Sequence, residues 1–443
     1  MIYSKASTIS YYYILVNYIL FTTAFIPTIH HERNKFLTSS SYYSLSSPPC
    51  TILSSSSSPI NNDSTNNTNT NNNKIQLNNI KPRTGIAQQL LDLALMSPLW
   101  KLILVPMARK NIVKTAQANG IQWIDSYQWL MSQNGPWKEC NNNNNNIESN
   151  YMEYPEFYTK EFHAYDKGNL CWDAAIEQEL ASRAVGARNF PEYGSNGEDA
   201  FRQSFENALV SLGATVPDNG VIVDLGCGTG TSTRRLASLF PQAKRIIGLD
   251  LSPYFIEVGK FLLQIGPKGQ DEGGPWVTTI ENDERIELSV GNALSTGLPD
   301  ASVDIVNLSL VIHELPLSAT CKVAEEALRI LKPNGKLCIS EMDFDSPAYA
   351  AQRSNAMLFS LLRSTEPYLD EYADGFPDFL KFLVEKFQSV KITAATGRHY
   401  ALVGTKGDDM GTNKTAILDD KRFDRDGKYI VDDTHLKVWE SKQ

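Results

Sequence analysis

The sequence predicts an α/β protein with a doubly wound, mostly parallel sheet, and two patterns carry that prediction. From residue 221 onward, five short runs rich in β-branched residues alternate with helix-length stretches, which implies βαβ units and parallel pairing. Two later runs are separated by only four residues, enough for a hairpin and too short for a crossover. We therefore expect a Rossmann-like, seven-stranded sheet with a helical N-terminal extension. The five parallel strands are expected at 221–225, 245–250, 285–290, 303–309 and 336–341, and the terminal hairpin at 389–394 and 399–404.

Length and composition favour a globular body with a sizeable core. The chain has 443 residues, of which 42% are hydrophobic and 21% charged, and its formal net charge is −9. Residues 1–80 contain four basic and two acidic side chains, so the remainder carries −11. An acidic body argues against a broad nucleic-acid-binding face, which needs a surplus of Lys and Arg. We therefore expect no nucleic-acid partner.

Cysteine usage indicates neither a disulfide scaffold nor a metal site. The six cysteines form no CxxC pair, and they do not combine with the six histidines in a spacing typical of metal ligands. We therefore expect no metal. We interpret each cysteine as a small buried hydrophobic residue.

The first 80 residues are predicted to be a targeting sequence rather than part of the folded domain. Lys5 precedes an apolar run over 11–21, and small residues ending in Ala24 follow it, which is the layout of a signal peptide. Phe25 and a stretch rich in Ser, Thr and Asn come next. This junction resembles the two-part plastid presequences of algae with secondary plastids. We expect chloroplast targeting through a transit peptide, with the secretory pathway as the alternative.

A helical region is expected between this presequence and the first strand. Residues 170–188 and 201–212 carry helical periodicity. The segment 86–107 is apolar and helix-like, but its prolines and charges exclude a simple membrane span. It is expected either to pack on the core or to make peripheral contact with a membrane surface.

A glycine-rich loop follows the first strand, in the sequence VDLGCGTG at 223–230. Alternating glycines let a backbone approach a ligand closely, and the following helix N-terminus favours negative charge. Asp250 ends the second strand, where its carboxylate can accept hydrogen bonds from two ribose hydroxyls. The pattern therefore predicts a ligand that contains a nucleoside. Its GxGxG spacing differs from the dinucleotide fingerprint GxGxxG, which argues against a nicotinamide-dependent oxidoreductase.

Three downstream motifs identify the kind of nucleoside ligand. They are GNA at 291–293, DIVNLS at 304–309 leading into VIHEL at 311–315, and LKPNG at 331–335. In this order and spacing the set resembles the class I S-adenosylmethionine-dependent methyltransferases, particularly the small-molecule branch of ubiquinone and menaquinone biosynthesis. The resemblance covers residues 220–343 and extends more loosely to 405.

The resemblance implies S-adenosyl-L-methionine as the cofactor and assigns its contacts. Asp250 takes the ribose, Asn292 and Ala293 contact the adenine, and Ser309 is another contact in that branch. The methionine end is assigned to Asp224, Gly226, Gly228, Thr229 and Gly230. The segment 311–316 and the region after 343 do not place a quinone pocket, so the acceptor stays open.

Methyl transfer is mostly a matter of alignment and exclusion of water, with a base where the acceptor carries a proton. His313 and Glu314 lie just past the fourth strand and are the leading candidates for that base. The alternative is that both residues merely contact a helix start. Glu341 and Asp343, past the fifth strand, are further candidates.

Two segments outside the core motifs could close or line the site. His163 and Tyr165 could belong to a lid of N-terminal helices, or could pack as aromatic residues between those helices. Glu366, Tyr368 and Tyr372 lie between the fifth and sixth strands, where the family often places acceptor-binding insertions. The stretches 165–172 and 364–372 also resemble parts of a plant and cyanobacterial subfamily of these enzymes.

We interpret the chain as a plastid methyltransferase acting on a small acceptor that could be lipophilic. One alternative is a protein or RNA methyltransferase, which the acidic charge disfavours. Another is a non-catalytic module that binds S-adenosylmethionine. The expected division is a presequence and spacer at 1–80, a helical region or lid at 81–217, the methyltransferase domain at 218–405 and a charged surface tail at 406–443.

Overall fold

A computed structural model describes residues 105–138, 153–163, 165–265, 283–355, 359, 362, 365–408 and 417–430. The predicted presequence at 1–80 lies outside these residues. So does the segment 86–104, and with it nearly all of the predicted membrane-contacting segment 86–107. Both interpretations stay predictions.

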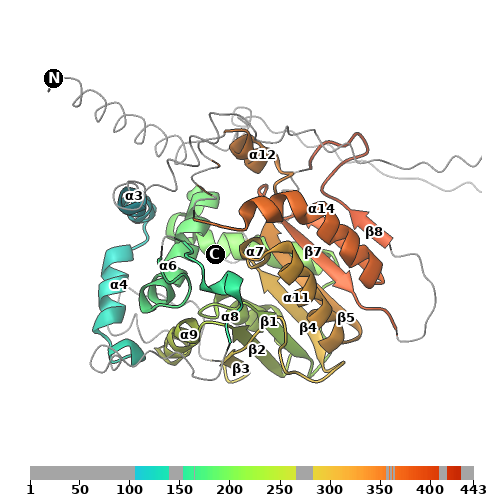
Figure 1. Cartoon of the computed structure of the whole chain (residues 1–443), viewed down its shortest axis with the longest axis horizontal. Helices are drawn as coiled ribbons and strands as arrows, with labels where there is room; N and C mark the ends of the chain where they lie inside the picture. Colours follow the sequence, from blue (N-terminus) through green and yellow to red (C-terminus); the bar gives the residue numbers. More distant parts are fainter. Residues whose placement is uncertain are drawn as a thin grey trace, which may run out of the picture.

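The central sheet has the order β3-β2-β1-β4-β5-β7-β6-β8, and its mostly parallel strands with an antiparallel hairpin confirm the predicted fold class (Figure 1). β1 pairs in parallel with β2 and β4, and β5 pairs antiparallel with β7. The carboxyl ends of the parallel strands therefore meet along one edge, where ligands bind in open α/β sheets. The strands are β1 (Val221–Leu225), β2 (Arg245–Asp250), β3 (Ile286–Val290), β4 (Val303–Ser309), β5 (Leu331–Met342), β6 (Ser389–Ala394), β7 (His399–Thr405) and β8 (Ile417–Asp420).

Helices cover both faces of the sheet because successive strand residues point to opposite sides. Val223 and Val306 belong to one hydrophobic cluster, together with α11 (Leu317–Ile330) and α14 (Leu369–Lys386). Their neighbours Ile222 and Ile305 belong to a second cluster with α7 (Gly197–Ser211) and α8 (Thr231–Leu239). Such helices on both faces make the sheet doubly wound.

The N-terminal region is helical, as predicted. α6 (Trp172–Asn189) and α7 coincide with the stretches that carry helical periodicity. α3 (Val105–Ala118), α4 (Trp123–Ser132) and α6 share a hydrophobic cluster with α9 (Pro253–Ile265), which follows β2. This packing joins the N-terminal helices directly to the sheet domain, at the side where β2 and β3 end (Figure 1).

Residues 406–443 were expected to form a surface tail, and the structure corrects this expectation for residues 417–422. Residues 417–420 form an eighth strand, β8, parallel to β6, and Arg422 is only 3% exposed. Arg422 lies 3.1 Å from buried Asp343 and 2.8 Å from Asp420. Residues 424–428 are exposed, as the charge in the sequence indicated, whereas Arg422 is paired with carboxylates inside the fold.

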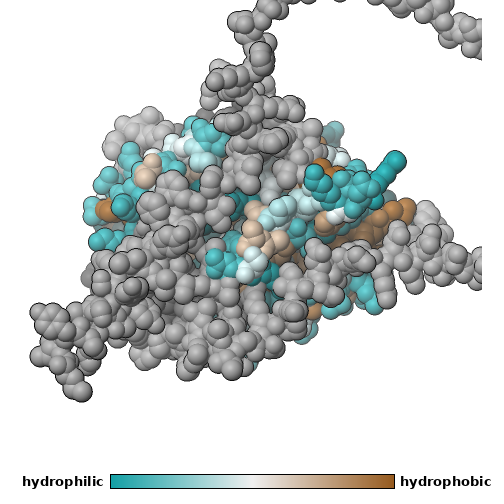
Figure 2. All heavy atoms as spheres, turned by 90° about the horizontal axis from the view of Figure 1, so that it is seen from above, coloured by the Kyte–Doolittle hydropathy of each residue, from teal (hydrophilic) through white to brown (hydrophobic). Residues whose placement is uncertain are grey.

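No helix among the described residues is long and apolar enough to cross a membrane. Hydrophilic and hydrophobic residues are interspersed over the coloured part of the face in Figure 2. Ile417 and Leu418, on the edge strand β8, are among the exposed apolar side chains.

The buried ion pair between Arg422 and Asp343 should be important for stability. Arg422→Met should lower the free energy of unfolding by about 3–5 kcal/mol, because it leaves the carboxylate of Asp343 buried without its cation. Urea denaturation of the full chain, followed by circular dichroism, measures the change. The matched control is Arg425→Met at an exposed position, which should change stability by about 0.5 kcal/mol or less. Equal losses in the two variants would show that Arg422 is no more than a surface charge.

Candidate active site

The loop after β1 leaves no room for side chains at its glycines. Gly226 and Gly228 have positive φ angles of 70° and 56°, which are strained for other residues. A Cβ on Gly226 would lie 2.8 Å from Val311, and one on Gly228 would lie 2.7 Å from the amide of Gln178. The loop is therefore a bare-backbone surface, with Gln178 of α6 lying against it. Thr229 donates to Gln178 from its backbone N–H at 3.3 Å and also through its hydroxyl.

Asp224, at the end of β1, forms hydrogen bonds that fix the elements around this loop. Its carboxylate is fully buried and accepts hydrogen bonds from Ser232 and Thr233 on α8, both at 2.7 Å, and from Asn307 on β4 at 2.8 Å. Burial raises the pKa of Asp224, while these three donors act in the opposite direction. In this structure Asp224 ties β1, α8 and β4 together, and its assignment as a cofactor contact stays a prediction.

Asp250 connects the second strand, the glycine loop and the N-terminal region. One carboxylate oxygen accepts from the backbone N–H of Gly228 at 2.9 Å. The other accepts from the backbone N–H of Ser252 at 2.8 Å and from the hydroxyl of Tyr158 at 3.2 Å. These bonds use three of the roughly four lone-pair positions of a carboxylate. A position remains for a ligand hydroxyl, and Tyr158 demonstrates that a hydroxyl can reach Asp250 from the cleft side.

The other predicted cofactor contacts lie at neighbouring strand ends. Asn292 and Ala293 follow β3, and the side-chain oxygen of Asn292 accepts from the backbone N–H of Leu294 at 2.9 Å. Ser309 ends β4, and its hydroxyl accepts from Arg202 of α7 at 2.9 Å. The fold thus brings the predicted residues to one edge of the sheet.

His313 is held by a fully buried carboxylate. It lies in the 3-10 helix η4 (Ile312–Glu314) after β4, and its Nδ1 is 2.9 Å from both carboxylate oxygens of Glu341 on β5. Burial alone would lower the pKa of His313, but the charge and hydrogen bond of Glu341, together with the charges of Glu366 and Glu314, outweigh burial and raise the pKa to about 10. His313 is therefore protonated at neutral pH, so it acts as a fixed cation rather than as a proton acceptor.

Glu314 lies in a cluster with His163 and Glu366. The Nε2 atom of His163 is 2.7 Å from Glu366 and 4.0 Å from Glu314. Burial raises the pKa of Glu314 to about 7, even though His163 and His313 favour its charged form. The side chain of Glu314 is 24% exposed, so it is reachable. A carboxyl group with this pKa suits general base catalysis near neutral pH.

The cluster also contains an unused acceptor atom. The Oε2 atom of Glu366 is buried and has no hydrogen-bond partner among the described residues. A buried oxygen without a partner is costly, so it is available to a polar group of a ligand. The structure thus brings together His163, Glu314 and Glu366, which are far apart in the sequence.

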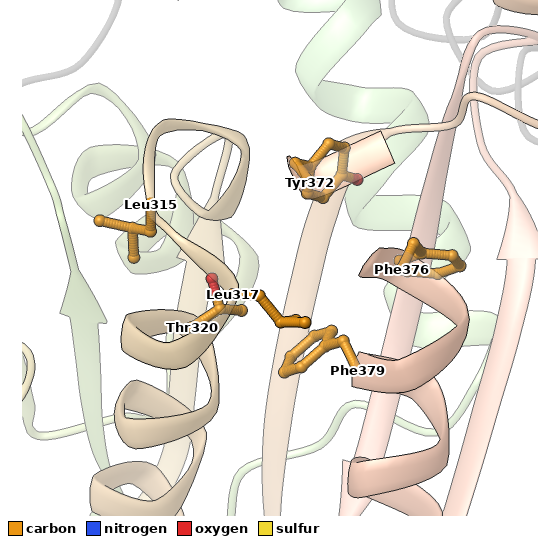
Figure 3. A pocket seen from close by; sticks show the side chains of 6 residues that line it. All are labelled: Leu315, Leu317, Thr320, Tyr372, Phe376 and Phe379. Atoms are coloured by element: carbon orange, nitrogen blue, oxygen red, sulfur yellow. The ribbon is translucent and has the colours of Figure 1, made fainter. Parts of the chain in front are cut away.

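A small apolar pocket adjoins this cluster (Figure 3). Tyr372, Phe376 and Phe379 of α14 face the start of α11 across it, and the ring of Tyr372 is 6.3 Å from that of His313. Its cavity volume is about 10 Å³, enough for about one water molecule and far below the roughly 300–1,000 Å³ of typical ligand pockets. It is therefore a small apolar hollow that cannot hold an acceptor as it stands. Leu315, Leu317 and Thr320 complete its lining.

Other predicted residues lie outside the polar cluster. Tyr165 donates to Glu177 and lies beside Arg109 within the N-terminal helices. Tyr368 lies under Lys160, with the ammonium 5.0 Å from the ring centre. Asp343 pairs with Arg422 and accepts from Tyr429 at 2.8 Å. The pairing of Asp343 indicates a structural role.

Sequence reasoning missed Tyr158, Gln178 and Arg202. Each reaches the cofactor edge from the N-terminal region, over separations of 92, 51 and 107 residues. Periodicity places such side chains on helices but does not indicate which loop they face. The described residues contain no group of His, Cys, Asp and Glu that could hold a metal ion.

Comparison with known proteins identifies the domain around this edge. Residues 223–339 match the model of the methyltransferase domain family. The chain is 36% identical over 129 residues to an uncharacterized methyltransferase of Emericella nidulans, covering 27% of this chain and 41% of that protein. It is 30% identical over 183 residues to a demethylmenaquinone methyltransferase of Lactococcus lactis, covering 39% and 66%. A trans-aconitate 2-methyltransferase of Azoarcus is 31% identical over 156 residues, covering 34% and 52%. In all three the match spans less than two thirds of the relative.

Among solved structures, the chain is similar to an O-methyltransferase family protein from Burkholderia thailandensis. It has 19% sequence identity and a TM-score of 0.36, over 53% of this chain and 62% of that chain. The domain family and the named relatives confirm the resemblance to class I S-adenosylmethionine-dependent methyltransferases and S-adenosyl-L-methionine as the methyl donor.

The residues at this edge fit that donor. The bare glycine loop suits close approach of its amino-acid part, and Asp250 retains an acceptor position for its ribose. Because the carboxyl of Asp250 is only 8% exposed, a hydroxyl bound to it is shielded from competing water.

Asp250→Ala should weaken the binding of S-adenosylhomocysteine by about 10- to 100-fold, because hydrogen bonds to a charged group contribute about 1.5–3 kcal/mol each. Calorimetric titration of the full chain measures this affinity, and NAD should not bind. Asp426→Ala, at an exposed position, is the matched control. Unchanged affinity in the Asp250 variant would refute the assignment of this edge as the cofactor site.

Proposed function

We propose that the protein transfers a methyl group from S-adenosylmethionine to a small acceptor, since residues 223–339 form a class I S-adenosylmethionine-dependent methyltransferase domain. The observation that carries the proposal is the cluster of Glu314, His163 and Glu366 at the ends of β4 and β5. A carboxyl group whose pKa is about 7 stands there, at the same edge as Asp250. A purely binding module would have no need of such a group.

When bound, the cofactor would supply a methyl group on a positively charged sulfur. The acceptor would form a bond to the methyl carbon as the bond between sulfur and that carbon breaks, and neutral S-adenosylhomocysteine would leave. Glu314 accepts the proton that the acceptor loses as its new bond to the methyl carbon forms. His163 stays beside Glu366 and stabilises the negative charge of Glu314 in its ionised form. Protonated His313, fixed by Glu341, adds a positive charge next to the site. Catalysis then depends on positioning and on excluding water from the cleft.

Two observations favour a small acceptor over a protein or RNA. The relatives named above include methyltransferases for demethylmenaquinone and trans-aconitate, which are small molecules. The N-terminal region also covers the cleft, because Tyr158 contacts Asp250 and His163 contacts Glu366. The apolar side chains next to Tyr372 are compatible with an acceptor that has a lipophilic part.

Turnover should depend on Glu314. Purified protein is incubated with methyl-labelled S-adenosylmethionine and a panel of phenols, quinols and carboxylic acids, and the labelled products are identified. Glu314→Gln should lower the rate with any accepted substrate by about 10²- to 10⁴-fold, the usual contribution of general base catalysis. Glu325→Gln, at an exposed position on α11, should leave the rate unchanged.

The pH profile separates a base from a structural residue. Because Glu314 must be ionised to accept a proton and its pKa is about 7, kcat/KM should rise as the pH increases through about 7. This rise should be absent in the residual activity of Glu314→Gln. A profile that is the same in both proteins would exclude Glu314 as the base. Binding of the donor without transfer to any acceptor would favour the non-catalytic alternative.

A plastid location belongs to the same proposal and rests on the sequence alone. The Ala24–Phe25 junction would expose an aromatic residue at the start of a transit peptide. Residues 1–80 fused to a fluorescent reporter should enter the plastid of a diatom, and Phe25→Ala should strand the reporter outside it. Ile26→Ala is the matched control. Identical distribution of the wild-type and Phe25→Ala reporters would remove the main support for a plastid address.

A further inference from the structure

One short segment of the N-terminal region reaches from the cofactor end of the site to the acid–base cluster. We call residues 154–163 the crossing segment. Its Tyr158 donates a hydrogen bond to Asp250 at the end of β2, at 3.2 Å, and the Nε2 atom of its His163 is 2.7 Å from a carboxylate oxygen of Glu366. The cluster lies where β4 ends, and only β1 separates β4 from β2, a distance of about 10 Å across the sheet. The five residues from Tyr158 to His163 can span about 16 Å, so they are long enough to pass over the end of β1.

The second half of the crossing segment also contacts the chain on either side of Glu366. The backbone N–H of His163 donates to the carbonyl of Thr365 at 3.0 Å. The ammonium of Lys160 lies 5.0 Å from the ring centre of Tyr368. These contacts attach the crossing segment to the acceptor side of the site, whereas the bond of its tyrosine attaches it to the cofactor side.

The backbone of His163 adopts a conformation that depends on such contacts. Its φ angle is 50°, in the left-handed region that residues with a side chain rarely adopt. Conformations of this kind persist only where the surrounding structure holds them, and they are found most often at functional sites. The side chain of His163 is 44% exposed, so burial alone does not fix its ring. The position of the ring therefore depends on the path of the crossing segment and on the carboxylates that the ring meets.

Three charged groups of the site face His163. Glu366 is the nearest, Glu314 lies 4.0 Å from the Nε2 atom, and protonated His313 is the third. Partial burial lowers the pKa of His163 and His313 acts in the same direction, but the two carboxylates outweigh both and raise it. In return, the charge of His163 lowers the pKa of Glu314. A displacement of His163 would therefore change the titration of both residues.

We propose that Tyr158 is a positioning residue for methyl transfer and that it acts through His163. Its hydrogen bond to Asp250 sets the path of the crossing segment, and that path places His163 in the acid–base cluster. This inference rests on the proposed function, in which Glu314 is the base. Tyr158 itself takes no part in the proton transfer. Because Asp250 is also assigned to the ribose of the cofactor, the same carboxylate organises both the cofactor end and the acceptor end of the site.

The position of His163 can be measured without a known acceptor. The ligand-free full chain is labelled with ¹³C in its histidine rings and titrated with acid and base by NMR, and His163→Gln identifies the resonance. In the wild type the midpoint should lie above the ordinary value of about 6.5, because two carboxylates face the ring. Tyr158→Phe, which removes only the hydroxyl, should move the midpoint down toward that value. The matched control Tyr127→Phe, which removes a hydroxyl that donates to Asp173 at 2.9 Å, should leave it unchanged.

Turnover gives a second measurement that a purely structural role of Tyr158 would not affect. With any acceptor found in the panel, the rise of kcat/KM with pH should lie at higher pH in Tyr158→Phe than in the wild type. The reason is that Glu314 loses part of the positive charge that favours its ionised form. Loss of fold stability alone would lower the rate at every pH and leave the midpoint of the rise in place. Asp250→Ala, which removes the other partner of the bond, should move the NMR midpoint of His163 in the same direction as Tyr158→Phe.

Three outcomes would overturn the inference. An identical midpoint in the wild type and Tyr158→Phe would mean that the contacts with Thr365 and Tyr368 place His163 on their own. An equal shift in Tyr127→Phe would indicate a general loosening of the N-terminal helices. A wild-type midpoint at or below about 6.5 would mean that the carboxylates do not hold the ring. Wild-type protein that shows the expected shifts but does not bind S-adenosylhomocysteine in a calorimeter would count against the proposed function instead.

Discussion

The site depends on one buried carboxylate, that of Asp250, which cannot be left without donors. It receives them from three separate parts of the chain, namely Gly228, Ser252 and Tyr158. Burial raises the pKa of Asp250, and these donors counteract the effect. Satisfying this one group fixes the glycine loop against β2 and brings the N-terminal region over the cleft. The same group presents a charged acceptor to a ligand, so the structural and binding requirements coincide.

The division of labour among the acidic residues follows from what lies next to each. Glu341 is fully buried and paired with His313, and its charge helps to raise the pKa of His313. Glu366 pairs with His163, whose side chain is 44% exposed, so solvent weakens that pair. Glu314 has the more distant partner at 4.0 Å and has a pKa near neutrality. Similar side chains are thereby suited to different roles, namely a structural anchor, a positioning group and the proposed base.

Local patterns predicted most of the fold, because hydrophobic alternation and turn spacing are local properties. The strands β1 to β7 and the helix α6 lie where these patterns put them, except that β5 begins at Leu331, five residues before its predicted start. β8 was missed because it has only four residues, two of them charged, and shows no clear alternation. Its pairing with β6 also brings Arg422 beside Asp343, 79 residues away. The glycine loop and Asp250 were predictable from spacing, whereas the contact of Tyr158 with Asp250 depends on a separation of 92 residues. Distant pairings of this kind leave no periodic signal in a single sequence.

The central claim is that the N-terminal region and the methyltransferase domain build one cofactor site. Hydrogen–deuterium exchange, measured by mass spectrometry with and without S-adenosylhomocysteine, tests it most directly. Ligand that contacts Asp250 beneath Tyr158 should slow exchange both at 226–230 and at 156–170, and NAD should slow neither. Protection confined to the glycine loop, with exchange at 156–170 unchanged, would contradict the claim and leave the N-terminal helices as a separate layer.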